Sequence, residues 1–137
     1  VDRGFHLVEL FRSGRTIVLA NDEVADAARA HERAHVHSRA ALHHLVETSA
    51  HEFGPRNVRI NAVAPSFVRT PRLMRFGNEF WDEISSALPL RRPAEPDDIA
   101  KALVFLLSDM STCMTGAIVP VDSGMAQVVA VKGFLRN

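Results

Sequence analysis

Tyrosine is absent from this chain of 137 residues. Any mechanism in which a phenol donates or accepts a proton is therefore excluded for this chain alone. Cysteine is nearly absent as well, and the single residue Cys113 cannot form a disulfide within the chain. Low cysteine use fits a reducing compartment, so a cytoplasmic protein is the expectation.

Long hydrophobic runs and net charge are also missing. The longest apolar runs, at 102–107 and 128–131, fall far short of the roughly 20 residues that span a bilayer. The 16 basic side chains balance the 16 acidic ones, so no net field draws the protein to nucleic acid or anionic lipid. We therefore predict neither a nucleic-acid nor a membrane partner.

The first half of the chain shows a strand, a helix and a second strand. A glycine turn precedes the apolar run Ile17–Ala20, which ends at polar residues, as a buried parallel strand does beside a site. Residues 26–53 have helical periodicity, and Gly54–Pro55 ends that helix. Residues 58–65, VRINAVAP, are typical of a second buried strand. The expected buried stripe of the helix is Ala34, Ala41, Leu42, Leu45, Val46 and Ser49.

The second half adds a flap, a helix and a strand. Residues 66–93 are irregular and rich in Arg, Pro and Phe, with a short helix predicted near 78–87. Pro96, Asp97 and Asp98 favour a helix start, because proline suits the first turn and carboxylates suit the positive end of the helix dipole. A strand is predicted at 117–121. This order predicts a parallel α/β sheet with right-handed crossovers. The expected core positions of the last helix are Ile99, Leu103, Phe105, Leu106 and Leu107.

Three segments, in order, resemble the carboxyl-terminal half of short-chain dehydrogenases/reductases. They are GRTIVLAND, SRAALHHLVETSAHEFGPRNVRINAVAPSFVRTP and PLRRPAEPDDIAKALVFLLSDMSTCMTGAIVPVDSG, and together they cover about 14–124. The resemblance implies an α/β fold, the carboxyl-terminal half of a Rossmann-like, doubly wound parallel sheet. It has three strands with flanking helices and a substrate flap at about 66–93. Residues 1–137 would form one partial Rossmann-like domain.

The resemblance places the catalytic positions at altered residues. The family uses a Tyr as proton donor or acceptor, a Lys four residues later and a Ser about thirteen residues earlier. The matching residues are His35, Arg39 and Asp22. An imidazole can act as acid or base near neutral pH, but Arg39 would disfavour its protonated form. Asp22 would oppose the negative charge that develops on the carbonyl oxygen.

The resemblance also implies NAD or NADP, held at the nicotinamide end by Pro65, Val68 and Thr70. The Val68 backbone and the Thr70 hydroxyl would contact the carboxamide, although Ser66 replaces a family glycine. No glycines match the Thr-Gly-x-x-x-Gly-x-Gly turn that cradles the pyrophosphate. The family's terminal Asp-Gly-Gly has become 122–124, Asp-Ser-Gly.

The family's strand order would leave residues 16–21 as an open, apolar sheet edge. Such an edge promotes aggregation unless it is covered, so we expect a longer product, another chain or a rearranged amino terminus to cover it. In the family the helices matching 26–53 and 97–108 pair across dimer interfaces. A homo- or hetero-oligomer through these helices is therefore expected.

A zinc site is the alternative from another class. His31, Glu32 and His35 have the His-Glu-x-x-His spacing of a zinc-protease helix, but no third ligand lies within reach along that helix. The six histidines between 31 and 51 are expected to form a polar helix face, with a pH-sensitive interface as the alternative. The flap arginines are expected to be solvated charges, with a phosphate- or coenzyme-A-binding flap as the alternative. The flap aromatics, Phe67, Phe76, Phe80 and Trp81, are expected to pack the flap. Three hypotheses follow: a degenerate non-catalytic subunit, a working oxidoreductase using His35 and Arg39, and a zinc hydrolase.

Overall fold

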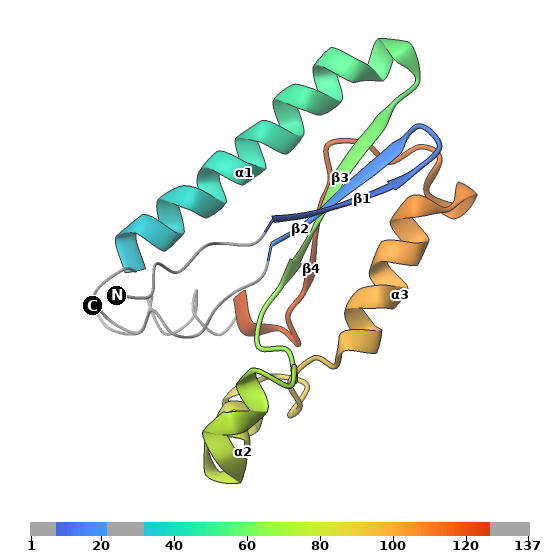
Figure 1. The fold of residues 1–137 in the computed structure, drawn as a ribbon. Coiled ribbons are helices and arrows are strands. Elements are labelled where there is room, and N and C mark those ends of the chain that lie inside the picture. The colour runs from blue at the N-terminus through green and yellow to red at the C-terminus, as the bar shows by residue number, and fades with distance from the viewer. Residues whose placement is uncertain (1–7, 22–31, 127–137) are drawn as a thin grey trace.

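The computed structural model describes residues 8–21 and 32–126, with side chains described at 14–19 and 41–126. Four strands form one sheet in the order β1-β2-β3-β4 (Figure 1). The strands are β1 Val8–Ser13, β2 Thr16–Asn21, β3 Arg59–Pro65 and β4 Ile118–Val121. The helices are α1 Glu32–Phe53, α2 Gly77–Ala87 and α3 Pro96–Leu107, with short 3-10 turns at Gly54–Arg56, Leu73–Phe76 and Asp109–Ser111. Within the described residues, no helix is both long and apolar enough to cross a membrane.

The three predicted strands form the parallel part of the sheet. β2 pairs with β3 from Thr16↔Arg59 to Ala20↔Val63, and β3 pairs with β4 from Ala62↔Ile118 to Pro65↔Val121. This confirms the predicted parallel α/β sheet with flanking helices. Pro120 lies on β4, which pairs with a single strand in the described sheet. Proline has no amide hydrogen to donate, and an edge strand tolerates this loss.

β1 was not predicted, and it pairs antiparallel with β2. All six of its residues have partners, from Val8↔Asn21 to Ser13↔Thr16. The two-residue connection contains Gly14 at φ 55, a left-handed conformation that glycine adopts without steric cost. The edge that the sequence was expected to leave open is therefore covered by the amino-terminal strand of this chain.

One helix covers each face of the sheet (Figure 1). On one face α1 places Val46 against Leu19 and Ala62. On the other face α3 places Leu103 and Leu106 against Val18 of β2 and Val63 of β3. Successive strand residues face opposite sides, so neighbours such as Val18 and Leu19 supply both cores.

Three predicted core positions are wrong. On α1, Ala41 and Leu45 are exposed, with 53% of Leu45 accessible. On α3, Phe105 is 37% exposed. Among the described residues, each face is covered by a single helix, so the contact of that helix with the sheet is a narrow stripe. Leu42, Val46 and Ala50, which recur every four residues, form the centre of this stripe. The other half-buried positions among the described side chains of α1 are His43, Ser49 and Phe53.

A buried polar network joins β3 to the segment that enters β4. The Asn61 side chain is 0% exposed. Its Nδ2 donates to the Met114 carbonyl at 3.0 Å, and its Oδ1 accepts from the Ala117 amide at 3.0 Å. The Arg59 guanidinium donates to the carbonyls of Leu106 and Ser108 at the end of α3, at 3.0 and 3.1 Å. These bonds fix α3 and β4 relative to β3.

Candidate functional site

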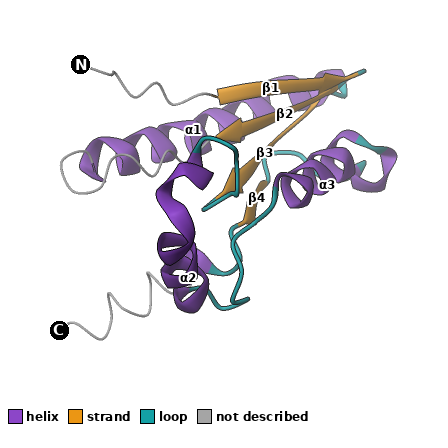
Figure 2. Ribbon diagram, turned by 60° about the horizontal axis from the view of Figure 1, so that its bottom comes forward, coloured by secondary structure: helices purple, strands orange, loops and turns teal. Residues whose placement is uncertain are grey.

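The candidate site is the carboxyl edge of the three parallel strands. β2 ends at Asn21, β3 at Pro65 and β4 at Val121, and parallel strands bring their carboxyl ends to one edge. The flap helix α2 stands beyond this end of the sheet and covers neither face (Figure 2). Ligands in open α/β sheets bind at such an edge, so the flap is positioned beside the site that the fold provides.

The structure places the predicted catalytic positions only in part. Asp22 lies outside the described residues. His35 and Arg39 lie four residues apart in the continuous helix α1, which puts them on one helix face, but their side chains are not described. His31 is outside the described residues as well. Among the side chains that the structure does describe, no group of three or more His, Cys, Asp or Glu could hold a metal ion.

A small bridge ties residues 65–70, called the nicotinamide segment after the contact that the resemblance implies, to the start of α3. Val68 pairs with Ala94 in parallel fashion. The Arg69 amide donates to the Ala94 carbonyl at 2.9 Å, and the Ala94 amide donates to the Phe67 carbonyl at 3.0 Å. Both bonds come from the neighbours of Val68, so the Val68 N–H and C=O point away from Ala94. An outward N–H fits the carboxamide contact that the family implies.

The rest of that segment is compatible with the same contact. Pro65, Ser66 and Val68 are buried, and Thr70 is half-buried. The Thr70 carbonyl accepts from the amides of Leu73 and Met74, both at 3.0 Å. Ser66 turns its hydroxyl oxygen to its own backbone, where it accepts from the Phe67 amide. The residue that replaces glycine is thus accommodated within the segment.

The altered glycine pair after β4 has a structural consequence. Ser123 has φ 54 and Gly124 has φ 86. A Cβ added at Gly124 would lie 2.7 Å from Cγ of Pro89 in the flap. Gly124 is therefore required for the close approach of the flap. Ser123 occupies a left-handed conformation that suits the glycine of the family pattern better than serine.

We expect Ser123→Gly to raise the free energy of unfolding by roughly 0.5–1 kcal/mol, because the left-handed backbone costs glycine nothing. Part of this gain is offset because glycine also makes the unfolded chain more flexible. Urea denaturation measures the change, and Ser86→Gly in α2 is the matched control, expected to destabilise. A Ser123→Gly protein less stable than the parent would show that the serine side chain stabilises this turn.

The flap contains an aromatic cluster. Phe80 lies 5.0 Å from Phe76, 5.2 Å from Trp81 and 6.0 Å from Phe67, measured between ring centroids. Trp81 is 2% exposed, and the Arg69 guanidinium carbon lies 5.4 Å from its ring centroid. These aromatics pack the flap, as expected. Arg69 is 36% exposed and also stacks on Trp81, a tertiary contact that sequence periodicity does not show.

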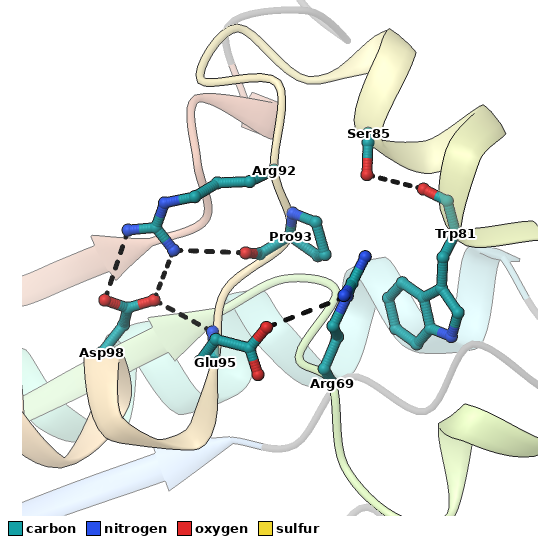
Figure 3. Close-up of polar contacts among 7 residues, drawn as sticks. All are labelled: Arg69, Trp81, Ser85, Arg92, Pro93, Glu95 and Asp98. Atoms are coloured by element: carbon teal, nitrogen blue, oxygen red, sulfur yellow. Dashed lines mark hydrogen bonds and ion pairs between the residues drawn. The ribbon is translucent and has the colours of Figure 1, made fainter. Parts of the chain in front are cut away.

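Ionic contacts fix the start of α3 beside the flap (Figure 3). Arg92 donates to Asp98 through Nη1 at 2.6 Å and Nη2 at 3.3 Å. The Glu95 amide donates to Asp98 Oδ2 at 2.9 Å, which stabilises the first turn of the helix. The Arg92 hydrogen bond, followed by the Glu95 amide, lowers the pKa of Asp98 to about 2. Asp98 is therefore ionised at neutral pH.

These features define a Rossmann-like α/β protein with a flap at the carboxyl edge of its parallel strands. A family model described as Enoyl-(Acyl carrier protein) reductase matches residues 5–126. The chain therefore belongs to the short-chain dehydrogenase/reductase family, and it resembles the NAD(P)-dependent oxidoreductases of that family.

Individual relatives agree with this assignment. Protein FixR of Bradyrhizobium diazoefficiens is 38% identical over 91 residues, which are 66% of this chain and 32% of that protein. The 3-oxoacyl-acyl-carrier-protein reductase FabG of Thermotoga maritima is 35% identical over 88 residues, 64% of this chain and 36% of that protein. The chain thus covers about a third of the length of these relatives.

A solved structure confirms the fold. A short chain dehydrogenase family protein from Francisella tularensis subsp. tularensis SCHU S4 superposes with a TM-score of 0.62 and 28% sequence identity. The match covers 74% of this chain and 46% of that one. The shared fold is the parallel sheet with its flanking helices.

Proposed function

We propose that this chain is a non-catalytic short-chain dehydrogenase/reductase subunit that acts within an oligomer. The observation that carries the proposal is the antiparallel pairing of β1 with β2 along all six residues. In the family a parallel fourth strand belongs at that edge. One strand edge offers one set of N–H and C=O groups, so a nucleotide-binding half can join the sheet there only by displacing β1.

The residues at the catalytic positions support the same proposal. His35 and Arg39 replace the Tyr and Lys, and Asp22 replaces the Ser that would orient a substrate carbonyl. A carboxylate at the last position opposes the oxyanion that hydride transfer creates. The set therefore lacks both the phenol and the neutral hydroxyl that carbonyl reduction uses in the family.

The cofactor fits this chain at one end only. Val68 and Thr70 would hold the carboxamide of NAD or NADP, and a bound nicotinamide would supply or accept hydride. The glycine turn for the pyrophosphate has no counterpart in the sequence. Because the charged phosphates contribute much of the binding of a dinucleotide at a helix amino terminus, we propose that affinity for the whole cofactor is weak.

The proposed oligomer contacts lie on the outer faces of α1 and α3. Leu45 on α1 is 53% exposed, Val104 on α3 is 62% exposed, and Met110 just beyond α3 is 71% exposed. Exposed apolar side chains on helices that each cover a sheet face alone are suited to contact with another subunit. The proposed partner is a second copy of this chain or an active relative.

The test is calorimetric titration with NADH and with NADPH, combined with an assay of nicotinamide oxidation on 3-oxoacyl substrates. FabG of Thermotoga maritima is the positive control. A triple variant, Asp22→Ser with His35→Tyr and Arg39→Lys, restores the family residues in the same chain. We expect neither binding nor turnover in the wild-type protein or in the triple variant.

Each other result has a defined meaning. Binding and turnover by the wild-type protein would overturn the proposal. Turnover by the triple variant alone would show that the side chains, and not the occupied edge of β2, block catalysis. The structural reason given above would then be wrong.

A second candidate is an oxidoreductase in which His35 and Arg39 act. The continuous backbone of α1 favours it, since it keeps the two residues one turn apart as the family requires. This candidate predicts that wild-type turnover, if measured, is lost in His35→Phe and retains an imidazole-like pH profile in Arg39→Lys. A zinc hydrolase predicts instead one tightly bound zinc per chain, which metal analysis measures directly.

A further inference from the structure

The flap is attached to the sheet end at several points. Its beginning and end are tied together by the Val68–Ala94 bridge. Near its end, the Leu90 amide donates to the Ser123 carbonyl at 3.3 Å, and Pro89 lies against Gly124. Backbone contacts thus fix the two ends of the flap. Helix α2, between them, is held to this base by side chains.

Arg69 is the side chain that spans from the base to the flap helix (Figure 3). Its guanidinium carbon lies 5.4 Å from the centroid of Trp81 on α2. Its Nε lies 3.8 Å from Glu95 Oε1, at the start of α3. One side chain therefore connects the nicotinamide segment, the flap helix and the amino terminus of α3.

The interactions that hold Arg69 in place are weak enough to be broken. Cation–π attraction to Trp81 is favourable because the indole is almost fully buried. The pair with Glu95 is too long for a hydrogen bond, and the two side chains are 36% and 50% exposed, so salt screens it. Among the described residues, the buried Arg69 Nε has no hydrogen-bond partner, which opposes the favourable contacts.

We propose that Arg69 is an electrostatic latch that holds helix α2 against the carboxyl edge of the sheet by stacking on Trp81 and pairing with Glu95. Closing the latch buries Trp81 and covers the nicotinamide segment with the flap. Releasing it lets α2 move while the backbone ties at both ends of the flap stay intact. Access to the edge therefore depends on ionic strength. This inference goes beyond the proposed function and does not depend on it.

Trp81 is the only tryptophan of the chain, so intrinsic fluorescence reports the latch in the intact protein. Quenching by acrylamide is the readout, because a neutral quencher is unaffected by charge changes. We expect the quenching constant of the wild-type protein to rise as NaCl is increased to about 1 M. At that concentration the Debye length is only about 3 Å, so the attraction between Arg69 and Glu95 is strongly screened. This salt titration needs no variant.

Two variants isolate the latch. We expect Arg69→Gln to raise the quenching constant at low salt by about twofold or more, because the opened flap exposes the indole. Glu95→Gln should give a smaller rise and remove most of the salt dependence. Arg75→Gln is the matched control, because it removes another flap guanidinium, whose carbon lies 5.4 Å from the ring centroid of Phe76. Circular dichroism confirms that each variant is folded.

Arg69→Lys provides a further discrimination, since it keeps the charge but changes the geometry, and it should restore part of the protection. Equal quenching constants in the wild-type protein, Arg69→Gln and Glu95→Gln would overturn the latch. An equal rise in Arg75→Gln would also overturn it, because loss of any flap arginine would then have the same effect. If the Arg69→Gln protein is unfolded, the salt titration of the wild-type protein decides. A quenching constant that does not change with salt would then contradict the proposal.

Discussion

Replacing Leu106 by Ala is expected to lower the free energy of unfolding by about 3–4 kcal/mol. Leu106 is 0% exposed and packs, with Leu103, against Val18 of β2 and Val63 of β3. The substitution removes buried methyl groups and leaves a cavity that the adjacent strands cannot close, because both also pack on α1 from the other face. Urea denaturation followed by circular dichroism measures the loss.

Val104→Ala is the control for this experiment, since Val104 lies two residues away on the same helix and is 62% exposed. We expect it to change stability by less than about 0.5 kcal/mol. Similar losses in the two variants would contradict the packing of α3 through its Leu103 and Leu106 face. The comparison therefore tests which side of α3 meets the sheet.

The second large effect is expected at Asn61. Asn61→Leu conserves size and removes both hydrogen bonds of the buried amide. The Ala117 amide then loses its side-chain partner, and the Met114 carbonyl keeps only the 3.3 Å bond from Arg59 Nη1. Each buried group left unpaired costs about 1–3 kcal/mol. We expect a total loss of roughly 1–3 kcal/mol, partly offset by the burial of a larger apolar surface.

Asn78→Leu is the matched control, because Asn78 is exposed near the start of α2, and we expect a change within about 0.5 kcal/mol. Thermal denaturation of the two variants measures the difference. If Asn61→Leu were as stable as the wild-type protein, the amide would not be the element that joins β3 to β4. The β3–β4 ladder, the Arg59 hydrogen bonds and the hydrophobic contacts would then be enough to place the carboxyl edge.

The parts of the fold that sequence patterns predict are those with local signals. β3 follows from the apolar run that ends at Pro65, and α3 from Pro96 and two carboxylates, where the structure begins that helix. β1 has no such signal. Its sequence VELFRS is short and mixed in polarity, and it forms a strand because Gly14 turns the chain back along an edge that would otherwise expose N–H and C=O groups.

In the candidate site too, features with a local sequence signal are predictable and tertiary contacts are not. The position of residues 65–70 is predictable, because they directly follow β3, and their contact with a nicotinamide stays a prediction. The contacts of Arg69 are not, since Glu95 and Trp81 lie far along the chain and approach only when the flap folds back. Likewise, Phe105 belongs to the apolar pattern of α3 yet is partly exposed, because no second helix covers that side in the described structure.

The most direct test of the account is native mass spectrometry of the protein purified from its source organism, followed by gas-phase dissociation of the subunits. The account predicts an assembly of more than one chain in which this subunit, once released, has the mass of its polypeptide alone. Any nucleotide would then leave with a partner subunit. A released subunit carrying one NAD or NADP would contradict the central claim that this chain does not use the cofactor.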